Sequence, residues 1–205
     1  YLDGAGVRAE SGKGYKLKAW DGKETRTLLH SENGHALVLH VSPTNQQVAF
    51  FEVSQPEGEF RLRVVDLQTK QTSDSDWFFS DDFPFDGAPN FYWSTNGKDV
   101  FYHQSSGERN GPGEETFSLM RFDPKSRTSH KLPVSEKTAV VAVLDEDHLA
   151  VVSRRDLSSG ILRISDGKLF ALPVRKRLLG GHGRHIAFAN YDTLKVEVAR
   201  FELIE

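Results

Sequence analysis

The sequence lacks cysteine altogether, and it contains a single methionine, Met120, among 205 residues. Without cysteine the chain forms no disulfide bond and offers no thiolate ligand to a metal ion. Long apolar runs are missing as well, since the most apolar stretches are only a few residues long, as in AVVAVL at 139–144. A helix that spans a membrane needs roughly 20 apolar residues. We therefore expect no membrane insertion by this segment.

An excess of positive charge is also absent, because 26 Lys and Arg residues stand against 29 Asp and Glu residues, for a net charge of -3. Proteins that bind nucleic acid generally carry a basic excess, so the sequence predicts no nucleic-acid partner. No stretch of a dozen residues has apolar positions at the spacing of an amphipathic helix. With 38% hydrophobic residues, the chain nevertheless has enough apolar material for a core.

The residues that are present repeat a pattern of an apolar strand, a polar turn and a second apolar strand. The second strands begin with VAF, VFY, LAV and IAF, and successive units are 37 to 52 residues apart. This spacing is typical of a four-stranded propeller blade of roughly 40 to 50 residues. The four units are residues 36–54, 90–106, 139–154 and 177–192.

A third strand with period-2 alternation follows each unit, which is typical of half-buried antiparallel strands. Three of these strands end at polar turns, at Asp66, at Asp123 and at 165–168, where Asp, Gly and Pro supply the turn chemistry. A short fourth strand comes after each of these three turns. The third strands are residues 60–67, 116–123, 160–165 and 193–201.

The sequence thus predicts an all-β chain, a β-propeller of about five blades made of four-stranded antiparallel sheets. Residues 14–30 fit the third and fourth strands of a blade. Residues 1–30 then either complete the last blade and close a ring, or the chain is part of a larger propeller. We assign the chain to a single domain, 1–205, with a partial blade at 1–30, blades at 31–87, 88–135 and 136–174, and a partial blade at 175–205.

Two units resemble the W-S-P-D-G-K-x-I-A-F repeat of TolB-like propellers, which propeller domains of the prolyl-oligopeptidase type share. The matching segments are HVSPTNQQVAFFEV at 40–53 and YWSTNGKDVFYHQ at 92–104. The last two units match only in their apolar strand. This resemblance implies a WD40-like scaffold that binds a protein, peptide or glycan. The repeat indicates the fold and does not indicate a reaction. It also suggests an extracytoplasmic location, periplasmic or secreted, although a cytoplasmic one remains open.

The segment 73–93 is the most unusual part of the sequence, since it places five Asp residues among eight aromatic ones. One interpretation is a recognition loop on the propeller rim, because loops on rigid scaffolds frequently carry function. The carboxylates would then suit Ca²⁺, although the spacing of an EF-hand is absent. The other interpretation is an inter-blade connection whose aromatic rings are covered. The candidate binding residues are Asp76, Trp77, Phe79, Asp81, Asp82, Phe83 and Phe85.

Three other features have weaker functional interpretations. The Gly-rich stretch 105–116 is long for a hairpin connection and is either a binding loop or a mobile one. His182 and His185 lie in a Gly-rich turn, where a metal site would need at least one more ligand. The basic run 175–177 is either a solvated segment or a patch for an acidic partner.

Catalytic motifs are not apparent. A serine in G-x-S-x-G is absent, and adjacent carboxylates on a strand point to opposite faces. We therefore expect no catalytic residues, no cofactor and no metal, and the sequence favours a non-enzymatic scaffold that binds a protein or peptide through propeller loops. Two alternatives are a carbohydrate-active or hydrolytic propeller with a site on the central axis, and a non-catalytic propeller segment of a larger multidomain protein.

Overall fold

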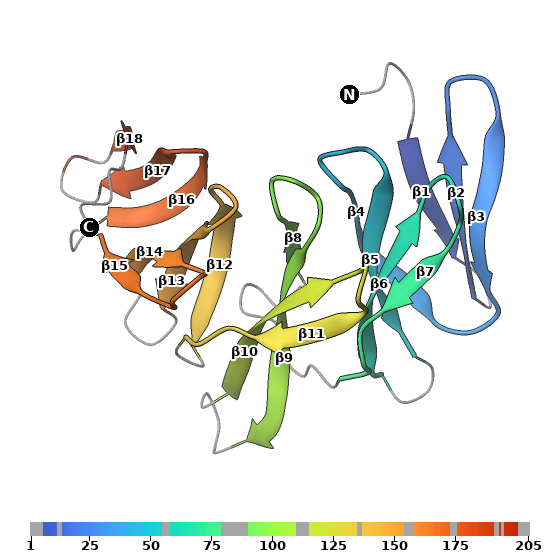
Figure 1. The fold of residues 1–205 in the computed structure, drawn as a ribbon, viewed down its shortest axis with the longest axis horizontal. Coiled ribbons are helices and arrows are strands. Elements are labelled where there is room, and N and C mark those ends of the chain that lie inside the picture. The colour runs from blue at the N-terminus through green and yellow to red at the C-terminus, as the bar shows by residue number, and fades with distance from the viewer. Residues whose placement is uncertain are drawn as a thin grey trace.

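The computed structural model describes residues 6–11, 14–54, 58–78, 90–109, 115–134, 137–153, 158–172, 176–190, 193 and 195–200. Within these ranges all of the regular secondary structure consists of β-strands, and the strands form five antiparallel sheets (Figure 1). In each sheet the strands follow one another in chain order, so each sheet is a meander. The predicted all-β fold is confirmed.

The first and last sheets have three strands, and the three between them have four. The first sheet contains β1 (Gly6–Ser11), β2 (Tyr15–Trp20) and β3 (Thr25–Ser31). The second contains β4 (His35–Val41), β5 (Gln47–Val53), β6 (Phe60–Asp66) and β7 (Thr72–Asp74). The third contains β8 (Phe91–Trp93), β9 (Val100–Arg109), β10 (Glu115–Asp123) and β11 (Thr128–Lys131). The fourth contains β12 (Thr138–Val143), β13 (His148–Ser153), β14 (Ser159–Arg163) and β15 (Leu169–Ala171), and the fifth β16 (Lys176–His182), β17 (His185–Asn190) and β18 (Lys195–Arg200).

A recurring turn identifies which strands of the first sheet correspond to those of the others. Between the last two strands of the second sheet, the Asp66 carboxylate accepts hydrogen bonds from the backbone N–H groups of the residues two and three positions later. Asp21 does the same between β2 and β3. Asp123 and Asp166 accept the N–H two residues later in the third and fourth sheets. The predicted strand pair at 14–30 is therefore correct, and β1 is an additional strand before it.

The turns of the first two repeat units are closed by a buried serine. Ser42 and Ser94 each accept a backbone N–H of the turn on Oγ, from Gln47 at 3.1 Å and from Asp99 at 2.9 Å. Three residues after each serine the chain adopts a positive φ, 57° at Asn45 and 69° at Gly97. Gly and Asn tolerate this left-handed conformation, which explains why the two units share their turn chemistry.

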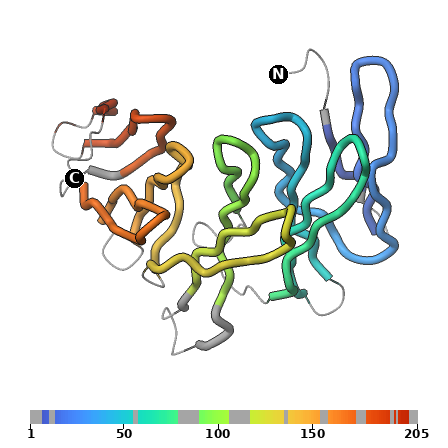
Figure 2. Tube along the Cα trace, in the orientation of Figure 1, coloured from blue at the N-terminus to red at the C-terminus, as the bar shows by residue number. Residues whose placement is uncertain are grey.

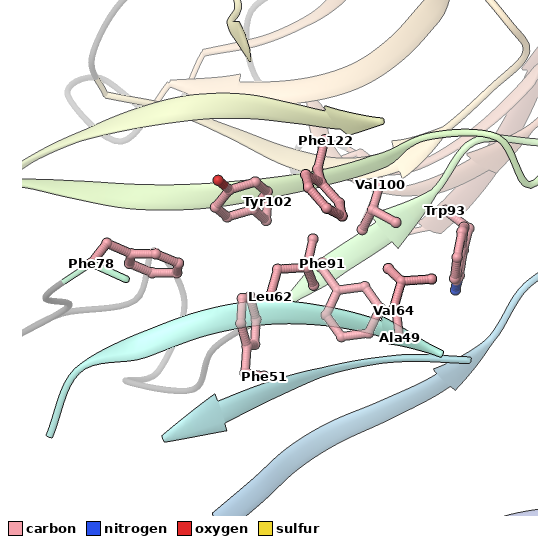
Figure 3. Close-up of a cluster of buried hydrophobic side chains, with 10 residues drawn as sticks. All are labelled: Ala49, Phe51, Leu62, Val64, Phe78, Phe91, Trp93, Val100, Tyr102 and Phe122. Carbon is pink, nitrogen blue, oxygen red and sulfur yellow. The ribbon is translucent and has the colours of Figure 1, made fainter. Parts of the chain in front are cut away.

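Neighbouring sheets pack face to face, and each contact has its own apolar cluster. The cluster between the second and third sheets contains ten buried side chains (Figure 3). Phe51 lies near its middle, with edge-to-face contacts to Phe78, Phe91 and Tyr102 at ring-centroid distances of 6.2, 5.4 and 6.4 Å. Such aromatic contacts add to the free energy of apolar burial.

The sheets follow one another along an open arc, with the first and fifth at its two ends (Figures 1 and 2). The first strands of the last four sheets, β4, β8, β12 and β16, are edge strands. Closure of a ring by residues 1–30 completing the last blade is not the arrangement found, because β1–β3 and β16–β18 form separate sheets. The four-stranded sheets lie within the ranges assigned to blades, while the single-domain assignment stays a prediction.

Candidate functional site

A hollow of about 640 Å³ lies where the four edge strands β4, β8, β12 and β16 come together. Each of these strands, or the turn directly after it, contributes to the wall, so residues from four sheets meet in one place. The wall consists mainly of aliphatic and aromatic side chains. The lining residues are Leu39, His40, Val41, Pro43, Phe91, Tyr92, Trp93, Thr95, Val141, Ala142, Val143, Gly181 and His182.

Three of the four edge strands are distorted beside the hollow. Their register shifts between Leu37 and His40 in β4, between Val140 and Ala142 in β12, and between Leu178 and Gly180 in β16. A β-bulge bends its strand and changes the direction of the side chains after it. In β4 the bulge holds Val38 at a φ of 53°, a conformation that is unfavourable for a β-branched residue. The bulges immediately precede or begin the lining segments of their strands.

His40 joins two sheets at this hollow. Its ring lies 4.9 Å from the ring of Phe91, and its carbonyl oxygen accepts a 3.2 Å hydrogen bond from Nε1 of Trp93. The ring remains accessible to solvent. Desolvation by the surrounding side chains lowers the pKa of His40. The imidazole is thus neutral at pH 7 and presents one donor and one acceptor to a ligand.

The end of the segment 73–93 forms β8, whose Phe91, Tyr92 and Trp93 line the hollow, whereas its described part after β7 lies at the outer edge of the second sheet. Of its seven candidate residues only Asp76 and Trp77 are within the described residues, and both are exposed. The segment is connected to the sheet at Phe78, whose backbone pairs with that of Phe60, and the Phe78 ring is buried. Phe79, Asp81, Asp82, Phe83 and Phe85 lie outside the described residues.

Trp77 is stacked on an arginine that belongs to a buried ionic network between the first and second sheets. The guanidinium carbon of Arg61 lies 4.4 Å from the Trp77 ring centroid, which is a cation–π contact. Arg61 Nε also donates a 2.6 Å hydrogen bond to Glu52. Trp77 remains 39% exposed, so one side of its ring is available for a partner.

Within this network the buried polar and charged groups form hydrogen bonds with one another. Glu52 accepts a 2.9 Å hydrogen bond from the Tyr15 hydroxyl, and Arg63 forms two hydrogen bonds with Asp74, at 2.9 and 2.7 Å. Burial raises the pKa of Tyr15, so this hydroxyl stays protonated. Desolvation alone would lower the pKa of Arg63, but the hydrogen bonds to Asp74 and the charges around the guanidinium together raise this pKa, so Arg63 stays charged. Because these charges are paired with one another, we interpret the network as structural.

The weaker candidates are only partly placed by the structure. The stretch 105–116 is less of a loop than expected, because β9 extends to Arg109, β10 begins at Glu115 and these two residues pair. His182 and His185 are both exposed and oppose each other across the turn between β16 and β17. Within the described residues, no group of three or more His, Cys, Asp or Glu side chains is placed to hold a metal ion.

A second hollow, of about 460 Å³, lies between the third and fourth sheets and is polar. Its charged groups bond to one another or to nearby backbone. Arg121 donates a 2.7 Å hydrogen bond to Asp99, and Asp147 accepts hydrogen bonds from the backbone N–H and the hydroxyl of Ser165, both at 2.8 Å. Its polar groups thus already have partners within the protein, which favours a structural role.

Comparison with known proteins supports the fold. Neither a known protein family nor a curated protein sequence matches the chain. Among solved structures, it is similar to an uncharacterised protein of Listeria monocytogenes, with a TM-score of 0.64, 10% identity and coverage of 91% of this chain and 56% of that one. TolB from Acinetobacter baumannii is similar with a TM-score of 0.54 and 19% identity, and the match covers 96% of this chain and 52% of that one. The β-propeller domain of the Trilobed protease from Pyrococcus furiosus, described as having an open velcro topology, is similar with a TM-score of 0.64 and 13% identity. The match covers 96% of this chain and 65% of that one.

The chain is therefore a β-propeller whose structural neighbours include TolB and a protease propeller domain. At these identities the likeness shows the fold alone. The chain spans between 52% and 65% of the lengths of these three solved chains. A search of the described residues for long apolar helices that would cross a membrane finds none.

Sequence reasoning did not recognise the hollow as the main site, although it singled out His182 and the segment 73–93, which includes Phe91, Tyr92 and Trp93. The lining residues are ordinary strand residues, separated by about 40 to 50 positions from one sheet to the next. The available signal was the repeat itself, because the first strand of each unit occupies the same edge of its sheet. Aligning the ends of these first strands would have brought His40, Trp93, Val143 and His182 together.

Proposed function

We infer that this propeller is a non-enzymatic scaffold that binds a segment of a protein partner in the hollow between its edge strands. The observation that carries this proposal is the convergence of four edge strands on one apolar hollow, with Val41 38% exposed in its wall. Hollows that bind ligands are mostly apolar and contain a few polar groups that orient the ligand. Here the imidazoles of His40 and His182 supply such polar groups.

An extended peptide with an apolar or aromatic side chain suits this wall. Edge strands leave one row of backbone N–H and C=O groups available, and peptides often bind by adding to such an edge. The side chain would enter between β4 and β12, while the neutral ring of His40 bonds to peptide backbone. The wall within the described residues contains no carboxylate, and glycoside hydrolysis commonly needs a pair of them, so the geometry favours binding over that chemistry.

The outer segment around Trp77 is a second candidate surface for the same function. Its exposed indole is held in place by Arg61, and a rigid aromatic side chain is a favourable anchor for a protein partner. We propose that Trp77 shares this surface with the other candidate residues, Phe79, Asp81, Asp82, Phe83 and Phe85. An extracytoplasmic location also remains a proposal, supported by the fold likeness to TolB.

Peptides selected from a random display library on the immobilised protein test this function. We expect the selected peptides to lose at least about tenfold in affinity, or about 1.4 kcal/mol, for the Val41→Asp variant, measured by titration calorimetry. The matched control is Leu169→Asp, which alters another exposed aliphatic strand residue, 54% exposed and outside the hollow, and which should bind normally.

The Trp77→Ala variant separates the two surfaces. If it weakens binding while Val41→Asp does not, the binding site is the outer segment and the proposal for the hollow is wrong. Equal binding by all three variants, or a library that yields no peptide, contradicts peptide binding at both surfaces. Circular dichroism and thermal unfolding of each variant establish that the fold is retained.

A further inference from the structure

The fifth sheet exposes an apolar face. Across β17 and β18, Ala187 pairs with Val198 and Ala189 pairs with Val196, and these four side chains point away from the fourth sheet. Val196 and Val198 are 67% and 69% exposed. Gly180 of β16 faces open space on the same side. We call the surface of Ala187, Ala189, Val196 and Val198 the terminal face.

The register shows that the terminal face is equivalent to surfaces that are buried in other sheets. The pair Ala187–Val198 corresponds to Ala150–Ile161 in the fourth sheet. In the fourth sheet this pair is covered by the fifth sheet, and its members are 0% and 2% exposed.

The second sheet repeats this arrangement. Its equivalent pair, Ala49–Val64, is 0% and 1% exposed and is covered by the third sheet. The terminal face therefore has the composition of a surface between two sheets of this propeller, and no sheet among the described residues covers it. Exposed neighbouring apolar side chains of this kind usually mark an interaction surface.

The opposite end of the arc is different. The face of the first sheet that points away from the second carries Arg8, Glu10, Lys16 and Lys18, in the cross-strand pairs Arg8–Lys18 and Glu10–Lys16. Glu10 bonds to both Arg8, at 2.9 Å, and Lys18, at 2.7 Å. Such a charged face is suited to water, and packing it against the terminal face would remove these charges from water without new partners.

We propose that the terminal face is the docking surface for a further antiparallel sheet that is continuous with this polypeptide. The sheet would present large apolar side chains, as the fifth sheet presents Ile186 and Phe188 to Ala150. Continuity with the four existing sheet-to-sheet contacts supports this occupant.

A cysteine introduced into the complete polypeptide that the gene encodes tests the proposal. Residues 1–205 contain no cysteine, so a thiol at Val198→Cys is identified by its own peptide in mass spectrometry. We expect it to be alkylated under native conditions as slowly as the thiol of Ile161→Cys, which occupies the equivalent buried position. Both should react about a hundredfold more slowly than Lys16→Cys on the charged face of the first sheet.

Each outcome decides the matter. Alkylation of Val198→Cys at the rate of Lys16→Cys shows an uncovered terminal face and overturns the proposal. Protection that disappears on dilution assigns the occupant to a second copy or to a separate partner, which also overturns it. Cysteine is smaller than Val or Ile, so overpacking is avoided, and a cooperative thermal transition verifies the fold of each variant. If Ile161→Cys fails to fold, Val152→Cys, in the same buried cluster, serves as the buried reference.

Discussion

The second sheet packs against a neighbour on each side, and the two contacts are filled differently. Toward the third sheet it presents Phe51 and Leu62 to a cluster of aromatic rings. Toward the first sheet it presents Phe50 in an apolar half, and Glu52 and Arg63 in an ionic half. Alternation along β5 separates the two sets, since Phe51 and Glu52 are neighbours that point to opposite faces.

The aromatic cluster and the ionic network contribute differently to the stability and to the alignment of the sheets. An aromatic cluster gains free energy roughly in proportion to the apolar area it buries, and it tolerates substitutions that conserve volume. A buried ionic network gains little net free energy, because desolvation offsets attraction, but it penalises strongly any arrangement that leaves a charge unpaired. The ionic half therefore fixes how the first two sheets align more than it stabilises them.

The largest effect is expected from the aromatic side. Phe51→Ala should lower the free energy of unfolding by about 4 kcal/mol, because a fully buried ring is lost and its three aromatic neighbours do not fill the cavity. Chemical denaturation measures this difference. Phe51→Leu, which keeps most of the volume, should cost about 1.5 kcal/mol. A cost of the alanine variant no larger than that of the leucine variant would show that this contact is loosely packed.

A substitution in the ionic network should lower the free energy of unfolding by a smaller amount. Glu52→Ala should cost about 3 kcal/mol, because Arg61 and Arg63 lose a carboxylate that is almost completely buried. Asp74 still pairs with both arginines, which limits the loss. Glu52→Gln, which keeps the shape and an acceptor for Tyr15, should cost less. Equal stability of the wild type and Glu52→Ala in urea denaturation would contradict this account of the network.

The smallest effect concerns the hydroxyl of Tyr15. Tyr15→Phe should cost about 1 to 2 kcal/mol at pH 7, because the hydroxyl donates one hydrogen bond to Glu52 and accepts another from Arg63. Burial raises the pKa of Tyr15 in the folded state, whereas the unfolded chain releases this proton near pH 10. The stability supplied by the protonated form is therefore present below about pH 10 and is lost as the pH rises further.

Denaturation curves at a series of pH values from about 8 to 11 test this dependence. The wild type should lose stability above pH 10 more steeply than Tyr15→Phe. Some loss remains in the variant, because burial also raises the pKa values of Tyr92 and Tyr102. Identical slopes for the two proteins would show that Tyr15 does not titrate differently in the folded and unfolded states.

Much of the architecture was predictable because it is local. Period-2 alternation and Asp-containing turns are properties of neighbouring residues, so the hairpin strands and turns of each sheet follow from short segments such as 60–74. The strand β1 was missed because GVRAES alternates only weakly in polarity. The length of β9 was underestimated because its end is Gly-rich and polar, and pairing with β10 overrides that composition.

The hollow was not predictable in the same way. His40 and His182 are 142 positions apart, and they face one hollow only because three successive sheet-to-sheet contacts set the curvature of the arc. No local pattern encodes that curvature. The segment around Trp77 was visible through its composition, but its interpretation depended on Arg61, whose position under the indole follows from the register of β6. The candidate residues from 79 to 85 remain predictions.

The meander topology has a consequence for how the chain forms during synthesis. In every sheet each described strand after the first pairs with the strand that precedes it in the chain, so no pairing among these strands has to wait for a distant segment. As the ribosome extends the polypeptide, each sheet completes its backbone hydrogen bonds from residues that have just emerged. We therefore expect the nascent chain to expose mainly the apolar face of its most recently completed sheet until the next sheet covers that face.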